Sequence, residues 1–344
     1  MRKNLLVLSA AGSFTLLSGA VLADIPVTTP GFSISVSGLY LQPNADNMTY
    51  AVYTTPLPLT TPNWQQLTVK PSYHGAFDLG LMYNFCDPTN HANLDWLHLN
   101  TRDSDSYSTS TPGTSVAPPY YFGPLAQALV GTSASSTANF DIDNVNLVFG
   151  HLINISNNIQ LDPFAGLQFA YLYQDIITNN VGSDSSSRPY SITSNYKSRF
   201  AGLGPRLGID GTYFFNCAFG LTAKMAGALM VGSMQSDSDF NSFGAGNPIT
   251  ANTKLADQTL NKVVPEMDGA LEANYRIPLK SNGSSVTFAL GYMVQEYFNA
   301  INQVVPTALV PGAFNGGTIA IETSEQSTSH LSMNGPYFNI TWKI

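Results

Sequence analysis

The alternation of apolar and polar side chains is clearest between residues 263 and 277. Odd-numbered positions run from Val263 to Ile277 and are apolar, whereas even-numbered positions from Glu266 onward carry most of the charged and amide groups. A period of two predicts a β-strand with one apolar and one polar face. Strands of soluble proteins usually have about 5–6 residues, and transmembrane β-strands need about 9–11. The length of this run therefore favours a strand of a membrane barrel over one of a soluble sandwich.

Similar alternation recurs along the chain and predicts ten strands. We place them at about 31–42, 67–85, 91–103, 137–151, 159–176, 195–213, 217–232, 259–278, 284–300 and 328–344. Short joins fall at 86–90, 152–158, 214–216 and 279–283, and long joins rich in Ser, Thr, Gly and Pro fall at 43–66, 104–136, 177–194, 233–258 and 301–327. Short turns at one end and long loops at the other are typical of outer-membrane barrels. We expect an all-β fold, a transmembrane antiparallel up-and-down β-barrel of about ten strands (8–12), with both termini at the periplasmic end.

Composition narrows the alternatives. Charged residues make up 10% of the 344 positions, against about 25% in an ordinary soluble domain. The 14 Lys+Arg face 22 Asp+Glu, so no nucleic acid partner is expected. Aromatic residues reach 11%, which argues against a disordered chain. After residue 23 there is no apolar run long enough for a transmembrane helix.

The first 23 residues have the three parts of a secretory signal peptide. Arg2 and Lys3 form the positive region, an apolar core follows, and small residues precede Asp24. A membrane anchor is the alternative, but the apolar run is short and broken by Gly12. We therefore expect a signal peptide at 1–23 and one barrel domain at 24–344.

Charged side chains on the polar strand faces should point into the barrel. They are Asp78, Asp162, Arg206, Asp210, Lys224, Glu266, Asp268, Glu272 and Arg276. Inside a narrow barrel such charges must pair or meet water. Two interpretations stay open: a salt-bridge network that fills the interior, or a charged pore wall that sorts ions. The excess of acids would give a pore a weak preference for cations.

Few groups suggest catalysis or metal binding. Metal motifs such as His-x-His or Cys-x-x-Cys are absent from the sequence. Asp95 and His98 are the nearest acid–His pair, but a spacing of three puts them on opposite faces of a strand. Asp237 and Asp239 lie where outer-membrane proteases carry acid pairs, yet they lack a nearby His. We expect no enzyme, no cofactor, no catalytic residue and no metal site.

Two stretches inside the long joins are too apolar for simple solvated loops, 118–129 and 304–313. Each could constrict the barrel mouth, pack on the rim as a short helix, or bind a partner. The last strand carries Phe338, Ile340 and Trp342 on one face. An aromatic girdle is expected at the periplasmic ends of the strands, from Trp342, Tyr83, Phe85, Phe149, Tyr213 and Tyr275.

Five motifs together resemble the Legionella major outer membrane protein family. They are NLDWLHL at 93–99, DPFAGLQ at 162–168, GLGPRLGID at 202–210, VPEMD at 264–268 and GPY at 335–337. They recur in matching order over almost the whole mature chain. The resemblance implies an outer-membrane β-barrel porin, associated with disulfide-linked assemblies and contacts with host cells.

The two cysteines are Cys86 and Cys217, at the first and third short turns. Four strands separate these turns, which puts the thiols on the order of 15 Å apart, whereas a disulfide needs Cα atoms within about 7 Å. We therefore expect interchain or reactive thiols, in agreement with the disulfide-linked assemblies that the resemblance implies. Two buried, reduced thiols are the alternative.

The favoured function is porin-like passive diffusion of small hydrophilic solutes across a bacterial outer membrane. The alternative is a surface adhesin or structural barrel with a closed lumen, because barrels of about eight strands are filled by side chains. An outer-membrane enzyme is a weak third. Expected partners are outer-membrane lipid, further copies of the chain in a homo-oligomer or disulfide-linked assembly, and a host or extracellular ligand at the loops.

Overall fold

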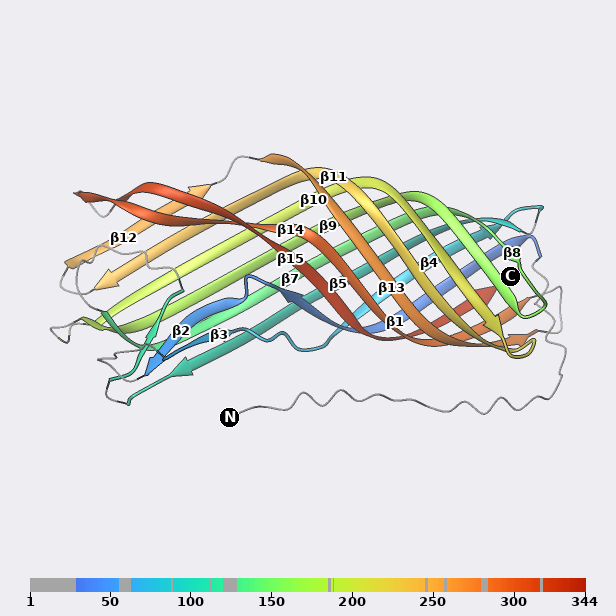
Figure 1. The fold of residues 1–344 in the computed structure, drawn as a ribbon, viewed down its shortest axis with the longest axis horizontal. Helices are drawn as coiled ribbons and strands as arrows, with labels where there is room; N and C mark the ends of the chain where they lie inside the picture. The colour runs from blue at the N-terminus through green and yellow to red at the C-terminus, as the bar shows by residue number, and fades with distance from the viewer. Residues whose placement is uncertain are drawn as a thin grey trace.

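The computed structural model describes residues 29–55, 63–87, 89–111, 113–119, 129–184, 187, 189–244, 247–256, 259–279, 284–315 and 318–344. The signal peptide expected at 1–23 lies outside these residues. Ten antiparallel strands form a closed ring, in the order β1-β4-β5-β7-β9-β10-β11-β13-β14-β15 and back to β1 (Figure 1). The predicted all-β barrel is therefore confirmed. In the described part of the chain, no helix has the length and hydropathy to cross a membrane.

The barrel strands are long. Their bounds are β1 (Gly31–Ala45), β4 (His74–Asn84), β5 (Asn90–Ser108), β7 (Leu129–His151), β9 (Ile159–Asp184), β10 (Pro189–Phe214), β11 (Phe219–Gly244), β13 (Leu260–Pro278), β14 (Ser285–Asn315) and β15 (Thr318–Lys343). Five further strands are short: β2 (Thr49–Thr55), β3 (Asn63–Thr68) and β6 (Ser115–Ala117) form a small separate sheet, β8 (Ile153–Asn154) pairs with β9, and β12 (Asn247–Ala256) pairs with β11.

The two ends of the barrel differ. At one end, called the turn end here, short turns join the strands, and the first residues of β1 pair with the last residues of β15. At the other, called the hairpin end, the strands run on into long hairpins (Figure 1). Both ends of the described barrel, Gly31 and Lys343, therefore lie at the turn end.

The prediction of long loops at the hairpin end was wrong for much of their length. In place of a loop at 177–194, β9 continues to Asp184 and β10 begins at Pro189. Similarly, β11 and β12 occupy most of 233–258, and β14 and β15 occupy most of 301–327. The stretches 177–194 and 233–258 are rich in Ser, Thr and Asn, so the apolar–polar alternation disappears while backbone pairing goes on, as between Ile177 and Asn195.

The first long join is also more ordered than predicted. It contains β2 and β3, and Thr68 closes β3, so the strand predicted at 67–85 begins only at His74. Leu67 and Thr68 pair with β2 instead of with the barrel. The prediction merged the end of β3 and the whole of β4 into one strand because both contain apolar residues.

An apolar belt surrounds the outer face toward the turn end. Each barrel strand contributes exposed apolar side chains, for example Val36, Leu79, Leu94, Leu147, Leu167, Leu207, Met225, Met267, Leu290 and Ile340. Contact of such a large apolar surface with water would be unfavourable in free energy, whereas lipid tails solvate it. The aromatic residues predicted for the girdle lie at the turn-end margin of this belt, where Phe149, Tyr275 and Trp342 are about half exposed.

Candidate functional site

The interior of the barrel is the candidate site, and it is layered along the barrel axis. Toward the turn end lies a cavity of about 380 Å³, called the polar chamber here. Of the residues predicted to face inward, seven line it: Asp78, Asp162, Arg206, Asp210, Lys224, Asp268 and Glu272. Glu266 is 1% exposed and lies just beyond the chamber, and Arg276 faces inward nearer the turn end. Because these charged residues alternate with outward-facing residues along their strands, they lie together inside the barrel.

Arg206 forms the roof of the polar chamber. Its Nη1 lies 3.1 Å from Glu266 Oε2 and donates to Gln168 Oε1 at 2.9 Å, and its Nη2 contacts Asp268. Gln295 Nε2 in turn donates to Glu266 Oε1 at 2.6 Å. Charges taken out of water are stable only when paired and hydrogen-bonded in this way. The network joins β9, β10, β13 and β14 along one side of the lumen.

Lys224 forms a second ion pair lower in the chamber. Its Nζ lies 3.1 Å from Glu272 Oε2, and the Tyr337 hydroxyl donates to the same oxygen at 2.6 Å. Other acids in the chamber are less well compensated: one carboxylate oxygen each of Asp78 and Asp162 has no hydrogen-bond partner among the described residues. The chamber wall is therefore acidic, with room for water beside its carboxylates.

Above the network the lumen is filled by hydrocarbon, called the apolar layer here. Nine of the ten barrel strands contribute a side chain that is at most 2% exposed: Leu41, Leu99, Ile142, Leu172, Phe200, Met230, Val264, Tyr297 and Leu331. These side chains belong to one contiguous cluster, and the tenth strand packs Ala76 against it. Among the described residues, these inward side chains are packed against one another and leave almost none of their surface to water.

Nearer the hairpin end, part of β14 bends into the barrel mouth. Residues 301–305 are buried at every position, so both faces of this extended segment are covered. Asn299 has a φ of 54° just before it, and the pairing with β15 shifts register there. Asn302 N donates to Ser198 Oγ at 2.9 Å, and Ser238 Oγ donates to Val304 O at 2.7 Å. For the apolar stretch at 304–313, Val304 and Val305 agree with the first of the three interpretations, in which the stretch constricts the barrel mouth. The side chains from 306 on lie outside the described residues.

A second segment, residues 47–51, covers the mouth beside it. Asn47 and Gln174 exchange two side-chain hydrogen bonds, of 2.8 and 3.0 Å. Met48, Tyr50 and Ala51 are each at most 1% exposed. Burial and the nearby carboxylate of Asp105 raise the pKa of the Tyr50 hydroxyl from 10.0 to about 12, because both disfavour the phenolate. Residues 47–51 and 301–305 together are called the mouth cover here. The other apolar stretch, 118–129, lies largely outside the described residues.

Comparison with known families matches residues 24–344 to the family described as Legionella pneumophila major outer membrane protein precursor. The chain belongs to this family. Comparison with curated proteins gives no match. As a major outer membrane protein of this family, the chain is a β-barrel of the bacterial outer membrane.

Several solved outer-membrane barrels are similar to this family member. The Escherichia coli outer membrane protease OmpT is 13% identical, with a TM-score of 0.43, and the match covers 92% of this chain and 98% of that one. A Pseudomonas aeruginosa FadL homologue is 8% identical (TM-score 0.28; 91% and 90% covered), and the Pseudomonas putida toluene transporter TodX is 7% identical (TM-score 0.29; 95% and 93% covered). These scores are low, so the function of this family member is inferred below from its own residues.

Asp237 and Asp239 lie on β11 at the hairpin end, but they do not form a site with a His in the described structure. Asp237 pairs across the strands with Lys197 and Asp239 with Asn195, while the alternate side chains Ser236, Ser238 and Phe240 are the buried ones. The acid pair therefore faces away from the lumen.

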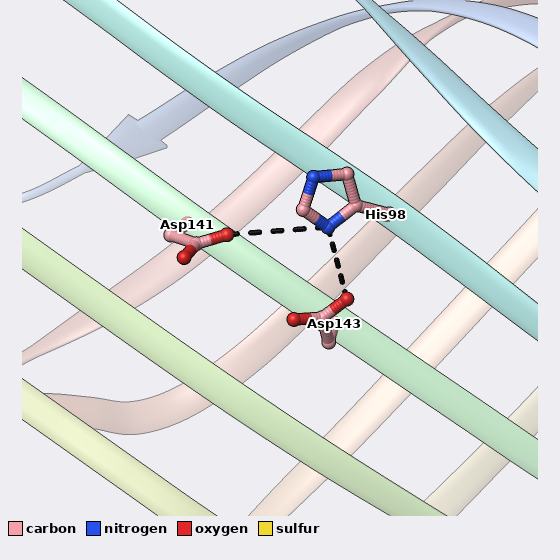
Figure 2. A group of neighbouring side chains, drawn as sticks. All are labelled: His98, Asp141 and Asp143. Carbon is pink, nitrogen blue, oxygen red and sulfur yellow. Dashed lines mark hydrogen bonds and ion pairs between the residues drawn. The ribbon is translucent and has the colours of Figure 1, made fainter.

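Sequence reasoning missed some site residues. Asp95 lines the polar chamber. The sequence could have predicted this, because Asp95 alternates with the outward Leu94 and Trp96 and shares its parity with the inward Leu97. Gln168 and Gln295 were missed because they are uncharged. As expected for a spacing of three, His98 lies on the outer face, opposite to Asp95, and it meets Asp141 and Asp143 there (Figure 2).

Proposed function

We propose that this barrel is a surface protein of the outer membrane whose lumen is closed and which acts through its hairpin end. The apolar layer carries this proposal. Nine strands bury large apolar side chains in one cluster across the lumen, and the mouth cover lies on top of it. A ring of ten strands is close to the size at which side chains fill the interior of a barrel. In this arrangement the turn end faces the periplasm and the hairpin end faces the exterior, where a host or extracellular ligand would bind; the proposal includes no enzymatic step.

Single-channel recording on the purified barrel tests this proposal. Folding is checked first on the same sample by the shift in gel mobility on boiling. We expect a silent bilayer, because the apolar layer excludes water and ions. Stable, stepwise conductance from the unmodified, folded chain would overturn the closed-lumen proposal.

The second candidate is porin-like passive diffusion of small hydrophilic solutes, and the polar chamber favours it. A structural barrel has no need of a cavity of about 380 Å³ with an acidic wall. The mouth cover is held by polar contacts such as Asn302 to Ser198 and Asn47 to Gln174, and such contacts can be exchanged for water. Displacement of the cover would also require the apolar layer to rearrange.

A matched pair of variants separates the two candidates. Ser198→Ala removes the acceptor of the Asn302 backbone N–H, and Asn302→Ala removes the hydrogen bond that Asn302 Nδ2 donates to Ser236 Oγ. Together they weaken the mouth cover, and under the diffusion proposal they should raise conductance with a weak preference for cations. Asp78→Asn in the same background should then reduce that preference, since Asp78 lines the chamber. A loosened barrel that stays silent would argue against diffusion.

We further propose that Cys86 and Cys217 form bonds between chains. Both thiols are free and exposed, which excludes the alternative of two buried thiols. Cys86 follows β4 and Cys217 lies between β10 and β11, so four strands of the ring separate them. Non-reducing gels of alkylated membranes should show multiples of the monomer that collapse with reductant. Cys86→Ser and Cys217→Ser should each remove bands, whereas a disulfide mapped within one monomer would contradict the assignment.

A further inference from the structure

The outer wall of the barrel carries a cluster of three metal-ligating side chains. His98 comes from β5, and Asp141 and Asp143 come from the neighbouring strand β7 (Figure 2). His98 Nδ1 lies 2.9 Å from Asp143 Oδ1 and 4.0 Å from Asp141 Oδ1, and one ligand atom from each residue falls within 4.8 Å of the others. His98 and Asp143 are 45 residues apart in sequence, so a search for short metal-binding motifs does not find them.

Neighbouring side chains fix the orientation of the cluster. The Trp96 indole N–H donates to Asp143 Oδ1 at 2.9 Å. The ring of Phe77 lies 5.4 Å from the His98 ring and 5.2 Å from the Trp96 ring. Partners of this kind, which hold the ligands of a metal in place, commonly raise its affinity. The imidazole and the carboxylate of Asp143 therefore need little rearrangement to take up an ion.

Asp141 supplies the observation that points to a ligand. The Asp141 side chain is 36% exposed, but its Oδ1 is shielded from solvent, makes no hydrogen bond among the described residues and lies 4.0 Å from His98 Nδ1. A cation between His98, Asp141 and Asp143 would satisfy this oxygen and would offset two negative charges on adjacent outward positions of one strand.

The cluster lies where the outward face of the wall changes from apolar to polar. On β5 the outward residues change from Leu94 and Trp96 to His98, and on β7 they change from Leu147 and Val145 to Asp143. The cluster thus lies at the hairpin-end margin of the apolar belt, next to the layer of lipid headgroups.

We propose that His98, Asp141 and Asp143 bind one divalent transition-metal ion of the Zn²⁺ class on the outer wall. An imidazole with two carboxylates suits Zn²⁺ better than Mg²⁺ or Ca²⁺, which prefer oxygen ligands alone. The ion binds the Nδ1 lone pair of neutral His98, in the tautomer that carries its proton on Nε2, and a proton held on Nδ1 before binding moves to Nε2 through solvent. Water fills the remaining coordination position, and the ion links β5 to β7 at the edge of the membrane.

Zn²⁺ titration of the folded barrel tests this site. The exposed thiols are removed first, as Cys86→Ser with Cys217→Ser, because thiolates also bind Zn²⁺. Calorimetry should show one saturable equivalent, and Asp141→Asn should weaken it at least tenfold while the hydrogen bonds of Asp143 stay in place. His330→Gln is the matched control: this His lies 3.9 Å from Glu296 on another part of the wall and should leave binding unchanged.

A second measurement locates the ion at the cluster. With Trp64→Phe and Trp342→Phe, Trp96 remains as the fluorescent reporter, and Cu²⁺ should quench it in the parent protein and much less in Asp141→Asn. Folded protein that binds no Zn²⁺, or an Asp141→Asn variant that binds Zn²⁺ as tightly as its parent, would overturn the proposal. Loss of binding in His330→Gln together with retention in Asp141→Asn would overturn it as well.

Discussion

The two halves of the lumen are built from the same ten strands but differ in the side chains that face inward. Toward the turn end, charged and amide side chains surround the polar chamber, and Arg206 and Lys224 each pair with acids of β13 along its wall. Toward the hairpin end, the same inward positions carry Leu, Ile, Phe and Met, packed without exposure. The first half keeps space and charge, whereas the apolar layer has neither, and polar groups such as Asp103 and Gln174 face inward again beyond it.

This difference shows where stability and function reside in the barrel. Backbone hydrogen bonds around the ring are common to both halves, so they cannot account for the contrast. Close packing of inward side chains adds dispersion and hydrophobic energy in the hairpin half alone. We infer that this half fixes the shape of the barrel, whereas the chamber can tolerate changes of side chain.

The sharpest test applies one substitution to both halves. Met230→Ala removes a side chain that is 0% exposed in the apolar layer, and it should lower the free energy of unfolding by about 2–5 kcal/mol. Met82→Ala removes a side chain that lines the chamber, and it should cost about 1 kcal/mol or less, because water can occupy the space. Denaturant unfolding in detergent micelles measures both. Equal losses would show that the two halves are packed alike.

Tyr337→Phe tests how much a single polar contact contributes in the chamber. The hydroxyl donates to Glu272 Oε2 at 2.6 Å, and a hydrogen bond to a charged group contributes about 1.5–3 kcal/mol. Because Lys224 still pairs with Glu272, we expect a loss near the lower limit of that range in the same unfolding experiment. A loss as large as that of Met230→Ala would mean that the chamber is as rigid as the apolar layer.

Alkaline pH should loosen the mouth cover through Tyr50. Its pKa is raised from 10.0 to about 12, so the neutral hydroxyl stabilises the folded state below pH 10, and this contribution is lost as the pH rises through 12. Difference absorbance of the phenolate, parent minus Tyr50→Phe, should show one group titrating near the upper value. If Tyr50→Phe leaves both the titration and the alkaline loss of stability unchanged, Tyr50 is not part of a closed cover.

The belt and the chamber could be predicted from sequence because both follow from a period of two. Glu266, Asp268 and Glu272 alternate with apolar neighbours, which assigns the wet and the lipid faces without any tertiary information. The apolar layer breaks this rule: Met230 and Val264 are apolar on the inward face, so alternation gives no sign that they meet in the lumen. Only the closure of the ring brings them together.

Two other features depended on contacts that sequence does not encode locally. The burial of residues 301–305 follows from the bend at Asn299 and the contacts with β10 and β11, neither of which has a pattern in the sequence. The cluster of His98, Asp141 and Asp143 depends on the register between β5 and β7, in which His98 lies directly opposite Asp143. A shift of that register by one residue would separate them.

The seam between β1 and β15 governs how the barrel can be made. Ser37 and Asn339 meet there across 302 residues of chain, so the seam is the most distant contact in sequence and has to form after the intervening strands have paired. Until it forms, β1 and β15 are open edges, and unpaired backbone groups in lipid cost several kcal/mol each. A chain that lacks either strand therefore inserts into the membrane at a higher free energy, because the ring stays open. Complete chains are favoured in the membrane for this reason.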